Sequence, residues 1–151
     1  MLKYNLSQID IISKKILSDL SDTDYIFLFG ELGSGKTTFT RSLIHQLQKK
    51  NQVDKTEVLS PTFNILHEYE IKSSKVMHYD LYRLKASKEI DQLGIFQDSK
   101  NVITIIEWPE KIKKDIENRL EITFYYEPEE EYRKINLQGF GKWKNFKLDA
   151  I

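Results

Sequence analysis

Eight consecutive residues have the types and spacing that bind phosphate. Residues 30–37 read Gly-Glu-Leu-Gly-Ser-Gly-Lys-Thr, which matches the pattern G-x-x-x-x-G-K-T. Glycines let the backbone turn sharply, so that successive N–H groups can point at phosphate oxygens. Lys36 would place its charge near the β- and γ-phosphates, and the Thr37 hydroxyl would bind Mg²⁺. The segment therefore predicts a nucleoside triphosphate site whose contacts are Glu31, Leu32, Gly33, Ser34, Gly35, Lys36, Thr37 and Thr38.

The segments on either side of this loop give the pattern its context. Tyr25–Phe29 is apolar throughout, as expected of a central strand that is covered on both faces. The residues after the loop predict a helix that ends near Lys50 and adds the positive end of its dipole to the phosphate site. A glycine-rich turn with a chance lysine is the alternative, but the bare pattern arises by chance in only roughly 1% of chains of this length.

Two acidic residues stand where predicted strands end. Asp80 follows Val76–Tyr79, and Glu107 follows Val102–Ile106. In an open α/β sheet the carboxyl ends of the strands line the ligand crevice, so either acid can face the phosphate loop. A phosphate loop needs such a carboxylate to hold Mg²⁺ directly or through water. We expect Lys36, Asp80 and Glu107 to serve catalysis and Thr37, Asp80 and Glu107 to serve the metal; which acid binds Mg²⁺ directly stays open.

Two further segments carry polar residues with candidate roles. His78, Asp80 and Tyr82 share one face of an extended segment, and Arg83 follows them. His78 and Tyr82 could position water, metal or a partner, or they could be structural side chains. Ser60-Pro61-Thr62 lies where many P-loop proteins keep a loop that senses the γ-phosphate, and Pro61 restricts Ser60 to extended conformations.

The remaining patterns favour an α/β protein of the P-loop NTPase fold, with a mostly parallel central sheet flanked by helices and added antiparallel hairpin strands. Apolar periodicity predicts a helix over Ser7–Leu20 with Ser7 as its N-cap. We expect the hairpin over residues 64–80 to lie between the first strand–loop–helix unit and the rest of the sheet. The pattern also predicts short helices and a second hairpin, at 87–93 (ended by Gly94), 112–118 and 120–137, the last with an acidic turn at 127–131.

Composition narrows the class of protein. The 151 residues predict a single domain over 1–151, and the 23 basic and 23 acidic residues argue against a protein that grips nucleic acid over a large face by itself. The absence of cysteine excludes disulfides, thiolate zinc sites and cysteine nucleophiles. We expect no signal peptide, because the first residues are polar and charged, and no apolar run approaches the roughly 20 residues of a membrane span. We expect a cytoplasmic protein without membrane contact.

Taken together, these motifs resemble the TsaE family of bacterial P-loop ATPases. The matching segments are Leu28–Arg41, Ser60–Phe63, His78–Leu84, Gln92–Ile95 and Ile105–Glu110. The motifs His-x-Asp-x-Tyr-Arg and Ile-Glu-Trp-Pro are far more specific than the phosphate loop alone. Glu31 and Ser34 stand where relatives are expected to have Asp and Ala, and the residues that contact adenine stay open.

The resemblance implies a Mg²⁺-dependent ATPase of low intrinsic activity, required for the modification of tRNA to threonylcarbamoyladenosine (t6A). It implies that the chain acts with TsaD and TsaB, that TsaD performs the transfer, that ATP hydrolysis supports turnover, and that tRNA is reached only through the complex. Thr62 would belong to the first switch loop, Asp80 would serve the metal or the attacking water, and Glu107 would be the acid of the Walker B-like strand. Arg83 and Trp108 would shape the nucleotide site or the partner surface.

Two other functions are weighed against this one. A small-molecule kinase shares the phosphate loop but generally adds an arginine-bearing lid, and this chain has only four arginines, with no Arg-rich insert. A nucleotide-gated binding module, with incidental hydrolysis, is the second alternative. Two well-placed acids favour hydrolysis, and the few arginines favour a slow enzyme that a partner completes. A GTPase is disfavoured because the sequence lacks an Asn-Lys-x-Asp run.

Overall fold

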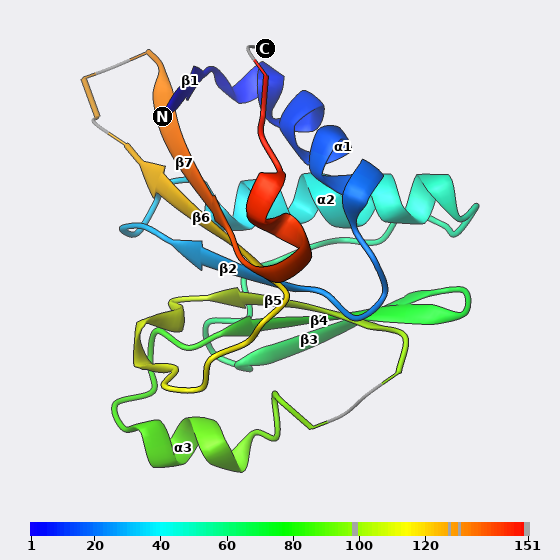
Figure 1. Cartoon of the computed structure of the whole chain (residues 1–151), viewed down its shortest axis with the longest axis vertical. Coiled ribbons are helices and arrows are strands. Elements are labelled where there is room, and N and C mark those ends of the chain that lie inside the picture. Colours follow the sequence, from blue (N-terminus) through cyan, green and yellow to red (C-terminus); the bar gives the residue numbers. More distant parts are fainter. Residues whose placement is uncertain (98–99, 127, 130, 150–151) are drawn as a thin grey trace.

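The structure is a computed structural model that describes residues 1–97, 100–126, 128–129 and 131–149. Within these residues seven strands form one sheet in the order β1-β7-β6-β2-β5-β4-β3 (Figure 1). The strands β6, β2, β5 and β4 at its centre run parallel, whereas β7, β1 and β3 pair antiparallel with their neighbours. The seven strands are Leu2–Tyr4 (β1), Tyr25–Phe29 (β2), Leu66–Ile71 (β3), Ser74–Asp80 (β4), Val102–Glu107 (β5), Arg119–Tyr125 (β6) and Arg133–Gly139 (β7). The predicted P-loop NTPase fold class is confirmed.

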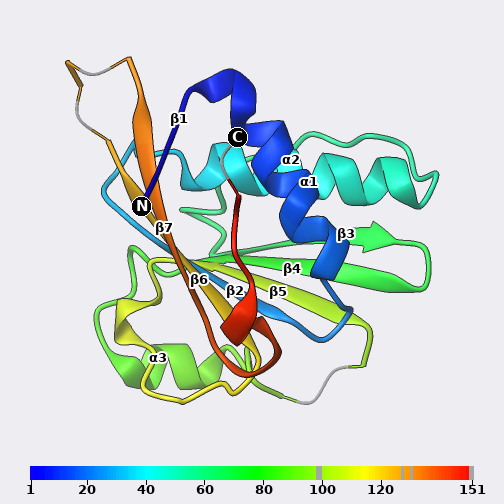
Figure 2. The same cartoon turned by 45° about the horizontal axis from the view of Figure 1, so that its top comes forward.

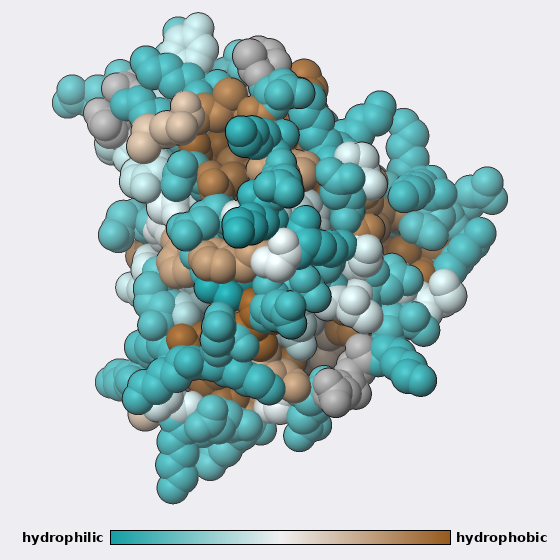
Figure 3. Space-filling view, viewed as in Figure 1, coloured by the Kyte–Doolittle hydropathy of each residue, from teal (hydrophilic) through white to brown (hydrophobic). Residues whose placement is uncertain are grey.

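Helices cover both faces of the sheet. The helices α1 (Ile9–Asp19) and α2 (Lys36–Lys50) pack together on one face, and the short helix α3 (Ser87–Gln92) lies on the other (Figures 1 and 2). In the space-filling view, hydrophilic side chains cover most of the visible face, and hydrophobic atoms show between them (Figure 3). The architecture is therefore three-layered, with β2 and β5 in the middle of the sheet.

The apolar run of β2 divides its side chains between two cores. Ile26 and Leu28 belong to the core under α1 and α2, whereas Phe27 points into the smaller core on the side of α3. The same alternation places Ile105 and Ile106 of β5 in opposite cores. Because both faces of these strands are covered, a continuous apolar sequence is stable here, and the strand ends are fixed in place.

Several predicted elements are confirmed, and three expectations are wrong. The hairpin β3–β4 forms an edge of the sheet beyond β5, and β2 pairs with β5 directly. The hairpin therefore does not lie between the first strand–loop–helix unit and the rest of the sheet. Ser7 is not the cap of α1, which begins at Ile9 after a 3₁₀ turn over Leu6–Gln8. Instead, the Ser7 hydroxyl donates to Asn5 Oδ1, and the backbone N–H of Asn5 donates to the Gln8 side chain at 2.9 Å.

The third wrong expectation is the helix over residues 112–118. A 3₁₀ turn spans Pro109–Lys111, and the chain after it is irregular. Ile112 and Ile116 have helical spacing, yet both pack against the core on the α3 side from this irregular segment. Without a helix, the backbone oxygen of Ile116 needs another hydrogen-bond donor, and the Arg119 guanidinium provides it through Nη1 at 2.7 Å.

Other parts of the chain lie outside the predicted pattern. Sequence patterns missed β1 and the 3₁₀ turn Gly141–Asn145, which buries Trp143. The predicted end of α3 at Gly94 is confirmed, with φ of +63°. Residues 127 and 130 of the expected acidic turn lie outside the described residues. Among the helices that the structure describes, each is too short or too polar to cross a membrane.

Candidate functional site

The phosphate loop joins the end of β2 to the start of α2, and two of its glycines are required by its shape. Gly30 and Gly35 have φ of +135° and +115°, conformations that side chains rarely adopt. A Cβ on Gly30 would lie 2.6 Å from the backbone oxygen of Phe124 in β6, which is too close for any other residue. The sequence therefore folds into a loop held tightly against the sheet, with the N-terminus of α2 opening onto it.

Lys36 extends back along this loop, although it carries a charge and is buried. Its Nζ donates to the backbone oxygens of Gly30 at 2.6 Å and Glu31 at 2.9 Å, and it lies 4.3 Å from the ring centre of Trp108. Burial lowers the pKa of Lys36, and the carboxylates of Glu107 and Asp80 act in the opposite direction. The ammonium group is thus positioned inside the loop, beside two acids.

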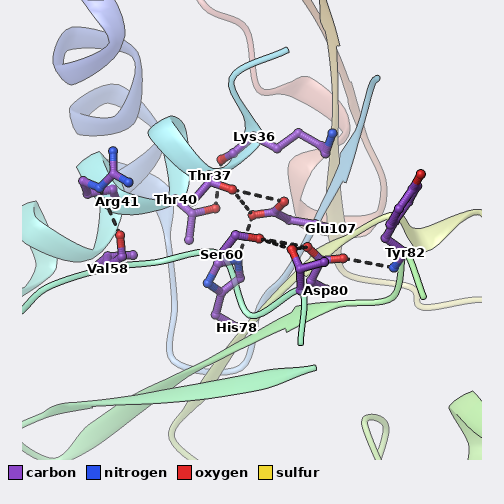
Figure 4. A network of polar contacts seen from close by, with 11 residues as sticks. Lys36, Thr37, Thr40, Arg41, Val58, Ser60, His78, Asp80, Tyr82 and Glu107 are labelled. Atoms are coloured by element: carbon purple, nitrogen blue, oxygen red, sulfur yellow. Dashed lines mark hydrogen bonds and ion pairs between the residues drawn. The ribbon is translucent and has the colours of Figure 1, made fainter. Parts of the chain in front are cut away.

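Glu107 joins the loop to the ends of β5 and β4. The Thr37 hydroxyl donates to its two carboxylate oxygens at 3.0 and 3.3 Å, and His78 Nε2 lies 2.9 Å from Oε1 (Figure 4). His78 is fully buried and Glu107 is 2% exposed. The contact with His78 of β4 therefore fixes the orientation of Glu107, while the Thr37 hydroxyl contacts it from the phosphate loop.

Asp80 lies beside Glu107, because the parallel pairing of β4 and β5 places these two residues opposite each other. Asp80 Oδ2 accepts hydrogen bonds from the hydroxyls of Ser60 at 2.9 Å and Thr62 at 3.1 Å. Its Oδ1 accepts one from the backbone N–H of Tyr82 at 3.0 Å (Figure 4). The loop that follows α2 in sequence is thereby attached to the second acid.

These groups surround one cavity of about 340 Å³. Its lining residues are Leu32, Gly33, Ser34, Gly35, Lys36, Thr37, Thr38, Ser60, Thr62, Asp80, Glu107, Trp108 and Arg133. Two predicted site residues are not among them. Glu31 contributes its backbone oxygen to Lys36, and the exposed Arg83 lies over the ring of Phe63 with 5.2 Å between its Cζ and the ring centre.

Ser60 and Arg133 line the cavity but were not singled out as site residues. Ser60 lies in the Ser-Pro-Thr segment, which could have indicated it. Arg133 follows the hairpin turn, far from the loop in sequence, and its Nη1 lies 3.3 Å from Ser34 O. No local motif identifies it, because its place depends on how β7 pairs with β6.

A larger groove lies elsewhere, between α1, α2 and residues 53–55, with a volume of about 1030 Å³. Its charged side chains are four lysines and two aspartates, and it lacks a phosphate loop. The smaller cavity is the better candidate because it combines the glycine-rich phosphate loop, a buried lysine and two buried acids.

The donor set suits a Mg²⁺ ion that arrives with a nucleotide. Within the described residues no group of three or more His, Cys, Asp or Glu side chains is arranged to hold a metal by itself. Mg²⁺ is commonly bound by one or two carboxylates together with phosphate oxygens and water. The Thr37 hydroxyl and the carboxylates of Glu107 and Asp80 fit that mode of binding.

The sheet order, the glycine-rich loop before α2 and the acids at the ends of neighbouring parallel strands define a protein of the P-loop NTPase class. The family model for "Threonylcarbamoyl adenosine biosynthesis protein TsaE" matches residues 4–135. The chain belongs to the TsaE family.

Individual relatives agree with this assignment. A TsaE of Rickettsia felis is 39% identical over 102 residues, which make up 68% of this chain and 57% of that protein. The chain thus spans little more than half of this relative's length. A TsaE of Aquifex aeolicus is 34% identical over 127 residues, 83% of this chain and 85% of that protein. The crystal structure of YdiB from Bacillus subtilis superposes with a TM-score of 0.66 at 25% identity, covering 93% of this chain and 86% of YdiB.

Proposed function

We propose that this chain is the ATP-binding and ATP-hydrolysing subunit required for t6A modification of tRNA, acting in the cytoplasm with TsaD and TsaB. It forms one domain over residues 1–151, supports turnover rather than performing the transfer, and reaches tRNA only through the complex. One observation carries the ATPase proposal: Lys36 and Thr37 of the phosphate loop face the buried acids Glu107 and Asp80 across one cavity. Membership of the TsaE family supports the t6A pathway.

Each group has a role that follows from its chemistry. Backbone N–H groups of the phosphate loop and the Lys36 ammonium bind the phosphate oxygens. Thr37 and Glu107 would hold Mg²⁺, which would supply positive charge to the phosphates. Asp80, already held by three donors, orients the attacking water or a water on the metal. Trp108 and Thr62 line the same cavity, where Trp108 lies beside Lys36 and Thr62 donates to Asp80.

The supply of cations in the cavity supports low intrinsic activity. Among the chain's four arginines only Arg133 lines the cavity, and Arg83 lies outside it. An arginine near the terminal phosphate commonly accelerates hydrolysis by about 10³ to 10⁵ and is often supplied by a partner. The sequence has no Arg-rich insert that could form the lid of a small-molecule kinase. A nucleotide-gated binding module would differ from the ATPase only in whether ATP is converted to product.

The test is steady-state ATP hydrolysis by the purified chain in Mg²⁺, with and without the TsaD–TsaB pair of the same organism. We expect slow turnover alone and faster turnover with the pair. Lys36→Ala should abolish turnover, whereas Glu107→Ala and Asp80→Ala should reduce hydrolysis more than ATP binding. Glu70→Ala, which removes an exposed acid of β3, is the matched control and should leave both unchanged.

Two results would contradict the proposal at different levels. Equal turnover with and without the TsaD–TsaB pair would contradict the assembly-dependent role but would leave the proposed nucleotide site standing. Normal turnover by Lys36→Ala would remove the site itself.

A further inference from the structure

Arg133 is the first residue of β7, and it reaches the phosphate loop from across β6. Its Nη1 lies 3.3 Å from the backbone oxygen of Ser34. A Cβ placed on Gly35 would lie only 3.1 Å from the same nitrogen. The guanidinium group therefore sits against the loop at the residues that immediately precede α2, where Gly35 leaves room for it.

The cavity has two chemically different sides. Glu107 and Asp80 come from β5 and β4, which lie on one side of β2, while Arg133 comes from β7 on the other side, beyond β6. Both sides line the same cavity, with the phosphate loop between them. If the terminal phosphates of a nucleotide lie at the acids, Arg133 stands on the opposite side of the phosphate loop from them.

The ring of Tyr126 lies against the guanidinium group, and Tyr4 lies beside it in the neighbouring strand. Arg133 Cζ lies 4.5 Å from the ring centre of Tyr126, which restricts the orientation of the planar group. Tyr4 lies opposite Arg133 in the β1–β7 pair, and its hydroxyl is 3.5 Å from the Gly35 Cβ position. Burial raises the pKa of Tyr4 to about 12, and Arg133 acts in the opposite direction. The hydroxyl therefore stays uncharged and does not neutralise Arg133.

Ser34 carries a polar side-chain atom that has no hydrogen-bond partner within the described residues. Ser34 Oγ is buried and makes no hydrogen bond within the described residues, although Ser34 lines the cavity. Buried polar atoms normally have partners, so this one is consistent with a site completed by a ligand. Ser34 and Arg133 both line the cavity, and the Ser34 hydroxyl lies under the loop, 2.7 Å from the Cβ position of Gly30.

We propose that Arg133 binds the phosphate nearest the nucleoside, the α-phosphate of ATP and ADP, and so contributes to nucleotide affinity rather than to cleavage of the terminal phosphate. This inference rests on the proposed nucleotide-binding function. A guanidinium group forms paired, charge-assisted hydrogen bonds with phosphate oxygens, for which its fork of donors is suited. Because ADP and ATP share the α-phosphate, Arg133 holds both.

The test measures binding and hydrolysis separately. Dissociation constants for MgADP and MgATP are determined by calorimetry for the wild type, Arg133→Gln and Arg133→Lys, together with the single-turnover rate of bound ATP. Lys3→Gln, an exposed residue of β1 next to Tyr4, is the matched control with the same change of charge. Thermal unfolding of each variant checks that it is folded.

We expect Arg133→Gln to weaken MgADP and MgATP by the same factor, about 10- to 100-fold, while the single-turnover rate stays within about threefold of wild type. Arg133→Lys should lose less, and Lys3→Gln should bind as the wild type does. Unchanged affinity for both nucleotides would overturn the proposal. So would a large fall in the single-turnover rate with ADP affinity unchanged, since that assigns Arg133 to the terminal phosphate. If wild type binds neither nucleotide, the proposed function itself fails.

Discussion

Replacement of His78 by leucine tests whether the buried histidine stabilises Glu107. His78 is fully buried, with Nε2 at 2.9 Å from Glu107 Oε1, and Glu107 is itself 2% exposed. In His78→Leu the carboxylate keeps only the hydrogen bond from the Thr37 hydroxyl among the side-chain contacts that the structure gives it. A buried charge left without its partner is strongly destabilising, which sets the sign of the effect.

The expected size follows from two opposing contributions. Leaving a buried charged group without its partner costs about 3–5 kcal/mol. Leucine also removes His78 Nδ1, which is buried without a hydrogen bond in the described residues, and relief of such an atom returns about 1–3 kcal/mol. We therefore expect the free energy of unfolding to fall by about 2 kcal/mol, which lowers Tm by about 4–8 °C for a chain of this size.

Urea and thermal unfolding measure this loss, and a double-mutant cycle with Glu107→Gln assigns its cause. Without the charge on residue 107, His78→Leu should cost at least about 1 kcal/mol less than it does in the wild type. His78→Gln, whose amide N–H can still donate, is the matched control. It should lose less stability than His78→Leu and keep more of the hydrolysis rate. Losses that simply add, with a coupling below about 0.5 kcal/mol, would refute the reasoning and assign the effect to packing.

Three further predictions concern single residues of the site and its surroundings. As pH rises, affinity for MgATP should fall before the ordinary lysine pKa of 10.5 is reached, because burial lowers the pKa of Lys36 and deprotonation removes its charge. Lys36→Arg should lack this fall in titrations across alkaline pH. The same fall in the wild type and in Lys36→Arg would contradict the prediction. Tyr4→Phe should leave the free energy of unfolding, measured by urea unfolding, unchanged or raise it by up to about 1 kcal/mol, because the Tyr4 hydroxyl is buried without a partner in the described residues. A clear fall in the free energy of unfolding would reveal a hydrogen bond of this hydroxyl. ATP binding should change the fluorescence of Trp108, whose ring lies 4.3 Å from Lys36 Nζ, so the change should vanish in Trp108→Phe and persist in Trp143→Phe.

The part of the site that the sequence could predict is the part set by local patterns and by parallel strand ends. The loop, its helix and the two acids required only a motif and the rule that carboxyl ends of parallel strands share one edge. The pairing of Asp80 with Glu107 in β4 and β5 agrees with that rule. The sequence also predicted that His78 and Asp80 share one face, but the contact of His78 with Glu107 depends on the register of two strands that are separated by a helix.

The parts that sequence patterns missed depend on pairings between distant segments. Arg133 enters the cavity only because β7 pairs with β6 and β6 pairs with β2, and no local period encodes that order. At residues 112–118 the error is of the other kind, because a local pattern is present but the helix that it predicts does not form. There the spacing of Ile112 and Ile116 fits a helix, but an irregular chain also buries both side chains. Apolar spacing alone cannot separate these two outcomes.

The positions of all four arginines bear on why such a site would hydrolyse ATP slowly. Arg41 donates to Val58 O, Arg119 pairs with Asp115 and Glu121, and Arg83 lies over Phe63. Arg133 is at the cavity, but on the side away from the two acids. Charge that develops on a terminal phosphate would therefore meet Lys36 and the metal, and no arginine of this chain. A cation or an ordering contact supplied from outside would lower the barrier further, which is the physical basis for expecting turnover to depend on the assembly.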